Sequence, residues 1–321
     1  VVLAVDLFID ESKKWMMGTL TGFVLLGAFV PVATLSVVGD DVRSMFDGRY
    51  VVDEYALVLQ ALFLLVGYVV VLLSQTELEE GGYYQGEYYL MLLVSVLGMV
   101  MLTSARDLVS VFVALELLSI PAYMMAAWNK RSAKSNEAGV KYYLLGVFAS
   151  GVLLYGMSYL YGTTGSTKLT DIADALAGDL MPMQVLAVVF VIAGFGFKVS
   201  AVPFHTWAPD TYQGAPTPVT AYLSVASKAA GFVALVTVLF VALHPADGVY
   251  EPFIWVLAAL TMTVGNVMAL RQTNIVRLLA YSSVSQGGFI LMPLAVISAG
   301  DAAESAMKAV VVYLLIYAFS N

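Results

Sequence analysis

Three ionisable side chains lie inside long apolar stretches of this sequence, at Glu116, Lys198 and Lys228. A charge at the centre of a membrane-spanning helix costs about 2.5–3.5 kcal/mol on insertion scales, so such residues usually serve a function. Carboxylates and amines bind and release protons, and the set therefore favours proton transfer between buried groups. The alternative is a static ion pair between helices, but one carboxylate does not neutralise two ammonium groups.

Glu116 lies about nine residues into its apolar stretch, which corresponds to roughly 14 Å along a helix. This depth places the carboxylate near the middle of a bilayer. Pro121 follows five residues later and removes a backbone hydrogen bond, so we expect the helix to bend or loosen there.

Lys198 precedes an unusually polar and proline-rich stretch, 203–218, which also carries His205. A surface loop would have the same composition. Discontinuous helices of transporters, however, have irregular backbone where a cavity or an ion path passes through the membrane. The sequence therefore predicts a broken helix beside Lys198, with the surface loop as the alternative.

Lys228 lies in a helix of small residues, where Ser224 and Ser227 are expected to help solvate its ammonium group. His205 is a further titratable candidate, because its unperturbed pKa is near 6.5. It either relays protons between Lys198 and Lys228 or caps the broken helix, and the sequence does not decide between these roles.

The composition requires a membrane around most of the chain. Hydrophobic residues make up 60% of the 321 residues and charged residues only 12%, against about 25% charged residues in a soluble domain. There is no cysteine, which leaves no disulfide framework and no Cys-ligated zinc or iron–sulfur site, and the two histidines are poor ligands for haem or copper. The net charge of −8 provides no basic surface for nucleic acid.

The hydropathy predicts an all-α polytopic membrane protein, with residues 1–321 forming a single transmembrane domain. Residues 162–182 read as a loop with one short amphipathic helix. We expect the run from Met307 to Ser320 to be too short to complete a span, and both ends of the sequence to be truncated. The stretches long enough for a span of about 20 residues are 16–38, 51–74, 87–105, 107–128, 138–161, 183–203, 217–243, 252–270 and 274–298.

The loops predict an orientation, because basic residues are more frequent on the cytoplasmic side of a membrane. With the alternation of these spans, one side holds Lys13, Lys14, Lys130, Arg131, Lys134, Lys141, Arg271 and Arg277. The other side holds Arg43, Arg49, Arg106, Lys168 and Lys308. We therefore expect the first side to be cytoplasmic and the protein to lie in the cell membrane.

Four motifs of this sequence form a recognisable set. The longest runs from Gly196 to Val219 and reads Gly-Phe-Lys-Val-Ser-Ala-Val-Pro-Phe-His-Thr-Trp-Ala-Pro-Asp-Thr-Tyr-Gln-Gly-Ala-Pro-Thr-Pro-Val, with Ser227-Lys228 after it. The others are Ala-Leu-Glu-Leu-Leu-Ser-Ile-Pro at 114–121, Lys-Tyr-Tyr-Leu-Leu-Gly at 141–146 and Gln-Thr-Asn-Ile-Val-Arg-Leu-Leu-Ala-Tyr-Ser-Ser at 272–283. Together these motifs strongly resemble the antiporter-like membrane subunits of respiratory complex I, NADH:quinone oxidoreductase. The Pro-Asp-Thr-Tyr-Gln-Gly-Ala-Pro-Thr-Pro wording is similar to the N-type subunit rather than to the L or M types.

This resemblance implies an antiporter-like bundle of two inverted five-helix repeats, each with a broken helix. The first repeat would occupy about residues 87–243, and about 252–321 would begin the second, whose lysine would lie beyond Asn321. The resemblance places the functional glutamate at Glu116, the lysine of the broken helix at Lys198, the connecting lysine at Lys228 and a supporting lysine at Lys141. One position departs from the family pattern, since Gln286 stands where a histidine is frequent, and glutamine does not titrate.

The resemblance further implies a proton-translocating subunit without a redox cofactor of its own. NAD, FMN, iron–sulfur clusters and quinone are expected in partner subunits, and the partners are other membrane subunits of complex I, including a neighbouring antiporter-like subunit. The same architecture leaves open a subunit of a multi-subunit cation/proton antiporter, and one of a membrane-bound hydrogenase or reduced-deazaflavin dehydrogenase. A structural scaffold with static ion pairs also remains possible.

Overall fold

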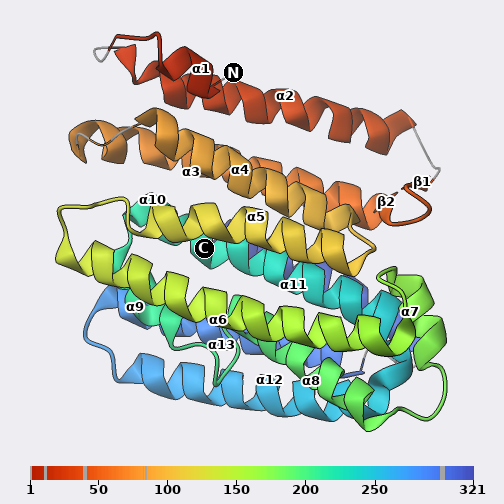
Figure 1. Cartoon of the computed structure of the whole chain (residues 1–321). Helices are drawn as coiled ribbons and strands as arrows, with labels where there is room; N and C mark the ends of the chain where they lie inside the picture. The colour runs from red at the N-terminus through yellow and green to blue at the C-terminus, as the bar shows by residue number, and fades with distance from the viewer. Residues whose placement is uncertain (1, 11–12, 39–41, 82, 84, 297–300) are drawn as a thin grey trace.

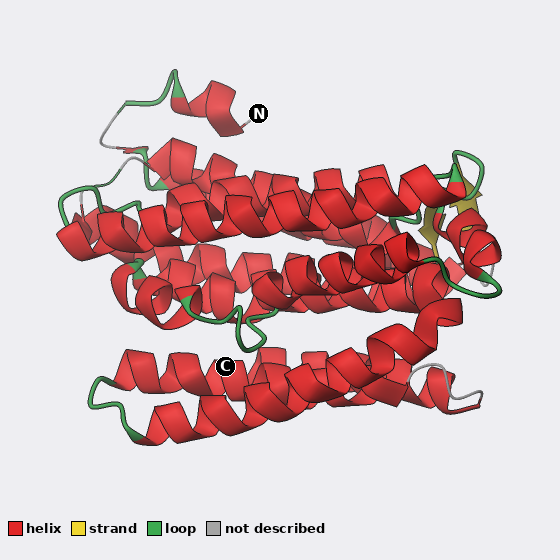
Figure 2. Cartoon of the chain, turned by 60° about the horizontal axis from the view of Figure 1, so that its bottom comes forward, coloured by secondary structure: helices red, strands yellow, loops and turns green. Residues whose placement is uncertain are grey.

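The protein is a bundle of long helices that lie side by side, as the computed structural model shows in two views (Figures 1 and 2). The structure describes residues 2–10, 13–38, 42–81, 83, 85–296 and 301–321. Every predicted span contains a long helix, although several helices begin or end a few residues inside the predicted limits, as in the spans expected at 51–74 and 183–203; residues 297–298 of the span expected at 274–298 lie outside the described residues. The early helices are α1 (Val2–Asp6), α2 (Met16–Val38), α3 (Glu54–Gly81), α4 (Gln85–Ser104), α5 (Leu108–Ala126) and α6 (Ala133–Thr164).

The second half of the chain contains shorter and less regular helices. They are α7 (Leu169–Leu176), α8 (Pro182–Lys198), α9 (Trp207–Gly214), α10 (Thr217–Tyr222), η2 (Leu223–Ser227), α11 (Lys228–Thr237), η3 (Val238–Leu243), η4 (His244–Ala246), α12 (Asp247–Leu270), α13 (Ile275–Leu291), η5 (Met292–Val296) and α14 (Asp301–Ser320). The short amphipathic helix expected within 162–182 is α7, which buries Leu169, Ile172, Ala173 and Leu176.

Eight helical segments of the described chain are long and apolar enough to cross a membrane. The longest, Thr217–Leu270, folds back on itself at η4, where Pro245 begins a tight turn, so α11 and α12 run in opposite directions (Figure 1). Large apolar side chains such as Phe148 and Trp255 remain exposed on the outside of the bundle. This surface suits a lipid environment, and the chain is a multi-pass membrane protein.

The helices end at two opposite ends of the bundle, which we call end A and end B. End A carries the connections 127–132, 215–216 and 271–274, at the left of Figure 1. End B carries the connections 105–107 and 165–168, at the right of that figure.

A two-stranded ribbon at end B was not predicted. Strands β1 (Arg43–Met45) and β2 (Tyr50–Val52) pair antiparallel around a turn in which Phe46, Asp47 and Gly48 all have positive φ. The Asp-Gly pair is a turn signal. It was overlooked because the flanking strands are only three residues long.

The prediction that the apolar run from Met307 to Ser320 is too short to complete a span is wrong. The apolar run after Met307 belongs to α14, a helix of 20 residues that begins at Asp301 and is long enough to span. Its first turns carry Glu304 and Lys308, whose exposed side chains form an ion pair. Charged residues therefore extend the helix beyond the apolar run that the hydropathy detected.

The core of the bundle is centred on α11, in which all ten residues are buried. A helix that is covered on every side needs apolar residues around its whole circumference. Lys228 at the start of α11 is its one charged residue, and Thr237 at its end is also polar and buried.

The broken helix exists, but it is interrupted at 199–206 rather than across 203–218. Residues 207–214 are helical as α9, because a proline is tolerated in the first turn, where its missing N–H has no partner to lose. Pro209 occupies the third position of α9 and Pro218 the second position of α10. These prolines begin helices instead of interrupting one.

Candidate functional site

Lys198 lies at the end of α8, where the chain leaves the helix. The N–H of Ala201 donates to the carbonyl of Gly196 at 2.8 Å, and that of Ser200 donates to Phe197 at 3.0 Å. Ser200 has φ +58. This arrangement is a Schellman motif, in which the left-handed position is usually a glycine. It stops α8 directly after Lys198, and the partial negative charge of a helix C-terminus favours a cation there.

Glu116 and Lys198 face the same small cavity, formed by α5, α6 and α8. The centre of a water-sized sphere can occupy about 20 Å³ of this cavity, so the cavity has room for about one water molecule. The Oε1 atom of Glu116 accepts a hydrogen bond from Ser150 at 2.6 Å. Lys198 donates from Nζ to the hydroxyl oxygen of Ser119 at 2.7 Å. Glu116 and Ser119 are three residues apart and hence neighbours on α5.

The side chain of Lys198 reaches α11, the helix that carries Lys228, at Gly231. A Cβ atom added to Gly231 would lie 2.8 Å from Cγ of Lys198, so the aliphatic part of Lys198 crosses α11 at this glycine. Gly231 is three residues after Lys228, which is about one helical turn. The crossing point therefore lies about one turn along α11 from Lys228.

Lys228 is 2% exposed and donates to Ser283 of α13. Its Nζ atom lies 2.8 Å from the carbonyl oxygen and also contacts the hydroxyl oxygen of the same serine. The ammonium group bonds Ser283 and neither Ser224 nor Ser227 among the described residues, and Ser224 donates to the carbonyl of Ala221. The expected solvation by those two serines is therefore wrong. The π-helical turn η2 precedes Lys228, and the side chain reaches across to α13.

Neither buried lysine forms an ion pair with any residue that the structure describes. Lys198 is 7% exposed and Lys228 is 2% exposed, and their hydrogen bonds go to hydroxyl and carbonyl oxygens. Glu116 shares a cavity with Lys198 but does not contact it within 4 Å, unlike the carboxylates of the ion pairs elsewhere in the described chain. The static ion pair considered for Glu116 is thus not present.

His205 lies in the interruption between α8 and α9. Its Nδ1 atom is buried and has no hydrogen-bond partner in the described part of the chain, and its ring lies 6.3 Å from that of Tyr281, centre to centre. Thr206, not His205, is the N-cap residue of α9. The geometry therefore does not favour the capping role, and a relay role stays a prediction.

Lys141 lies away from the buried lysines, at end A, within a cluster of charges. Its Nζ atom is 2.6 Å from Asp210 of α9 and 2.7 Å from Glu137. Arg277 of α13 bonds the other oxygen of Asp210 at 2.6 Å and also donates to Gln213 at 3.1 Å.

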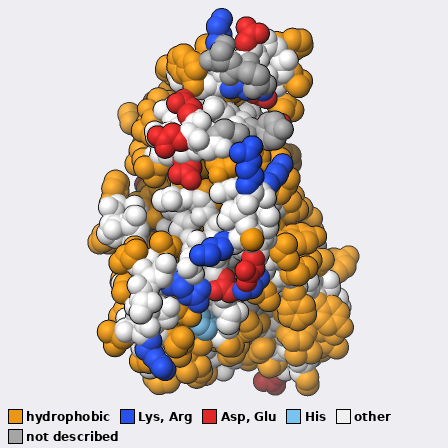
Figure 3. Space-filling model, turned by 90° about the vertical axis from the view of Figure 1, so that its left-hand side faces the viewer, with side chains coloured by type: hydrophobic (Ala, Val, Ile, Leu, Met, Phe, Trp, Pro, Cys, Tyr) orange, Lys and Arg blue, Asp and Glu red, His pale blue; other side chains and the backbone are white. Residues whose placement is uncertain are grey.

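We call Lys141, Asp210 and Arg277 the end A cluster. These residues join α6, α9 and α13 beside a polar cavity of about 180 Å³. The end A surface shows basic and acidic side chains grouped between apolar flanks (Figure 3).

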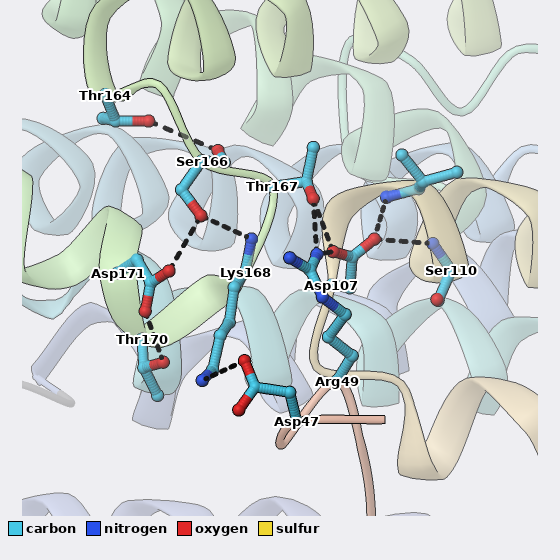
Figure 4. A network of polar contacts seen from close by, with 11 residues as sticks. Asp47, Arg49, Asp107, Ser110, Thr164, Ser166, Thr167, Lys168, Thr170 and Asp171 are labelled. Atoms are coloured by element: carbon cyan, nitrogen blue, oxygen red, sulfur yellow. Dashed lines mark hydrogen bonds and ion pairs between the residues drawn. The ribbon is translucent and has the colours of Figure 1, made fainter. Parts of the chain in front are cut away.

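A second network joins the connections of end B. Asp107 caps α5 by accepting the N–H groups of Val109 and Ser110, and it also accepts hydrogen bonds from Arg49 and Thr167 (Figure 4). Arg49 reaches Thr167 as well, at 2.8 Å. This network ties the β-ribbon to the connections that precede α5 and α7.

Several polar partners of the site were missed from the sequence. They are Ser119, Ser150, Ser283 and Tyr317. Ser119 could have been found, because it follows Glu116 at helical spacing. The other three come from helices distant in sequence, and no local pattern shows which face of each helix points inward. Among the described residues, no three His, Cys, Asp or Glu side chains gather in a way that could hold a metal ion.

Residues 105–321 match the family model described as "NADH:quinone oxidoreductase/Mrp antiporter, TM". The chain belongs to this family. The matched region contains Glu116, Lys198, Lys228 and the broken helix. The expected membership of the antiporter-like membrane subunits is confirmed.

Curated relatives of this family member include N-type subunits. It is 40% identical to "NADH-quinone oxidoreductase subunit N" of Desulfitobacterium hafniense, over 100% of this chain and 67% of that protein. It is 45% identical to "NADH-quinone oxidoreductase subunit N 2" of Solibacter usitatus, over 94% of this chain and 60% of that protein. The chain thus spans about 60–67% of the length of these relatives.

Two solved structures have a similar fold. A chain of respiratory complex I from Thermus thermophilus with bound aureothin is 34% identical, with a TM-score of 0.74 over 100% of this chain and 69% of that one. A chain of the Mrp complex from a Dietzia species is 20% identical, with a TM-score of 0.82 over 99% of this chain and 61% of that one. The second likeness concerns the fold alone.

Proposed function

We propose that this chain is a proton-translocating membrane subunit of a redox-driven NADH:quinone oxidoreductase. Protons pass through Glu116, Lys198 and Lys228, and the chain itself binds no redox cofactor. NAD, FMN, iron–sulfur clusters and quinone belong to partner subunits in this proposal. The names of the curated relatives support it, as does the likeness to a chain of complex I.

One observation carries the proposal: beside a broken helix, the buried side chain of Lys198 crosses the helix that carries the buried Lys228, and neither lysine contacts a carboxylate of the described chain. A buried ammonium that is fully paired with a carboxylate is strongly stabilised, and removing one partner costs about 3–5 kcal/mol. Hydroxyl and carbonyl oxygens stabilise the charged form less. A lysine with such partners can therefore release its proton when its surroundings change by a small amount.

In this mechanism Glu116 changes the electrostatic surroundings of Lys198. Its negative charge attracts the Lys198 proton through the shared cavity, and the attraction weakens if Glu116 is protonated or moves away. The Lys198 proton is then released towards Lys228, whose helix the Lys198 side chain already crosses at Gly231. Redox chemistry in partner subunits provides the free energy through a conformational change.

His205 and Lys141 have supporting roles. His205 offers a titratable ring in the interruption of the broken helix, with an unpartnered nitrogen. Lys141 acts through Asp210, since their ion pair holds α9 against α6. In this account Lys141 keeps the second half of the broken helix in position and does not carry protons itself.

The membrane arrangement follows the basic residues. End A, with Lys141, Arg277 and the basic connection 130–134, faces the cytoplasm, and the chain lies in the cell membrane. Residues 87–243 form the first antiporter-like repeat, and 252–321 begin the second. The surrounding partners are other membrane subunits of complex I, one of them a neighbouring antiporter-like subunit, together with lipid.

The test measures proton pumping and quinone reduction by the assembled complex in membrane vesicles. We expect Lys198→Ala and Glu116→Gln to lower the number of protons pumped per electron pair, while the complex still assembles. Lys308→Ala removes a lysine with a 72% exposed side chain and is the matched control. Unchanged pumping with both site variants would refute the proposal and favour a structural scaffold.

The same vesicles separate the alternative functions. A subunit of a cation/proton antiporter would show sodium-dependent proton movement without NADH, which the fold of the Mrp neighbour allows. A hydrogenase or deazaflavin dehydrogenase would copurify with a different electron-donor module. Identification of the copurifying subunits by mass spectrometry therefore decides between these complexes.

A further inference from the structure

The contacts of Lys228 continue beyond Ser283 into α14. The hydroxyl oxygen of Ser283 lies 2.8 Å from that of Tyr317, and either oxygen can be the donor of this hydrogen bond. Lys228, Ser283 and Tyr317 are 2%, 3% and 3% exposed. Three helices, α11, α13 and α14, thus contribute one group each to a continuous buried chain of exchangeable protons.

We propose that Ser283 and Tyr317 form a hydroxyl relay that carries protons between Lys228 and a water molecule beside α9. This inference rests on the proposed function and adds residues that act directly in it. A hydroxyl group has one donor proton and two acceptor lone pairs. Each member of the chain can therefore accept a proton on one side while it donates another.

The transfer is balanced at each oxygen. The Lys228 ammonium gives a proton to Ser283 Oγ, Ser283 passes its own hydroxyl proton to Tyr317, and Tyr317 passes its proton to a water molecule. Lys228 becomes a neutral amine, both hydroxyl groups regain one proton each, and the water becomes hydronium. The reverse sequence reloads Lys228.

A third hydroxyl group, that of Tyr212, lies beside the relay. Tyr212 of α9 is 3% exposed, and its hydroxyl makes no hydrogen bond of good geometry among the described residues. It nevertheless lies near the hydroxyl groups of both Ser283 and Tyr317. Buried polar groups are nearly always hydrogen-bonded to protein or to ordered water. Tyr212 therefore provides a binding position for the water that exchanges protons with Tyr317, and it belongs to the broken helix.

The decisive variants remove one hydroxyl and little else. Tyr317→Phe keeps the ring in its buried position, and Tyr313→Phe is the matched control one turn earlier on α14, where the tyrosine bonds Gln286 instead. In the assembled complex in vesicles, we expect Tyr317→Phe to lose the same share of pumped protons as Lys228→Ala. The double variant should lose no more than either single variant, because both lie on one path, and Tyr313→Phe should pump normally.

Two further readouts distinguish transfer from packing. Ser283→Ala should lower pumping and Ser283→Thr should restore it, since threonine keeps the hydroxyl. This pair also decides the matter if Tyr317→Phe does not assemble. Pumping that is limited by the relay should slow in heavy water by about twofold or more, whereas a packing defect would not add such an isotope effect.

The outcomes separate the relay from the proposed function. Normal pumping by Tyr317→Phe and Ser283→Ala, together with loss in Lys228→Ala, would overturn the relay and leave the proposed function intact. Normal pumping by Lys228→Ala would overturn both.

Discussion

The charges in the middle of the bundle and those at its two ends are partnered in opposite ways. At end A, Asp210 bonds Lys141 and Arg277, and at end B, Asp107 bonds Arg49. In the middle, Lys198 and Lys228 bond only hydroxyl and carbonyl oxygens of the described chain. Paired charges hold connections together. Burying a charge without a counter-ion costs folding free energy, and groups in that state are the ones that can gain and lose protons.

The network at end B should be the most sensitive to a stability measurement. Asp107 is 4% exposed and accepts from two backbone N–H groups as well as from Arg49 and Thr167. We expect Asp107→Ala to destabilise the protein by about 2–4 kcal/mol, because it removes a helix cap and leaves a partly buried arginine unpaired. Thermal unfolding of the purified complex measures the effect.

Asp107→Asn is the control for that variant. The amide oxygen still accepts the two backbone N–H groups, so the loss should be roughly half as large as in Asp107→Ala. A full-length complex whose unfolding temperature is unchanged in Asp107→Ala would show that this network does not hold end B together.

Gly231→Ala perturbs the middle of the bundle without removing a charge. The added Cβ would meet Cγ of Lys198 at 2.8 Å and Cβ at 3.2 Å, so the lysine must move away from α11. We expect a stability loss of about 1–3 kcal/mol from overpacking, together with reduced pumping. Quinone reduction and proton uptake in vesicles, measured side by side, report the pumping.

Gly151→Ala is the matched control, because an added Cβ there has nothing within 4 Å in the described chain. If Gly231→Ala and Gly151→Ala pump equally well, the position of Lys198 against α11 is not important for transfer.

The end A cluster should show a smaller effect that depends on salt. Asp210→Asn weakens two ion pairs whose partners are 42% and 28% exposed, and pairs of this kind contribute about 1 kcal/mol or less each. The expected loss at low ionic strength should shrink in about 1 M salt, where screening acts over about 3 Å. Thermal unfolding at two salt concentrations gives the comparison. A loss that salt does not change would mean that Asp210 is held by its hydrogen bonds rather than by charge.

Much of the fold could be predicted because hydropathy is a local property. The span expected at 16–38 coincides with α2, and Glu116, Lys198 and Lys228 lie in helices as expected. The interruption of the broken helix was placed too late, because Pro209 and Pro218 start helices. The real signal is Ser200 with its positive φ, which composition does not reveal.

The partners of the buried charges could not be predicted for a different reason. Ser283 is 55 residues from Lys228, and Ser119 is 79 residues from Lys198. Which serine meets which lysine depends on the rotation of each helix about its axis, and that rotation is set by packing in three dimensions. The serines near Lys228 in sequence were therefore the wrong choice.

The most direct test of the account compares Lys228→Met with Lys308→Met in the same assembled complex. Lys228 is buried without a counter-ion in the described chain, whereas Lys308 pairs with Glu304 on an exposed surface. The account predicts that Lys228→Met lowers the number of protons pumped per electron pair and leaves assembly intact, while Lys308→Met changes pumping by less than about 10% and stability by less than about 0.5 kcal/mol. Equal pumping by the two variants would contradict it.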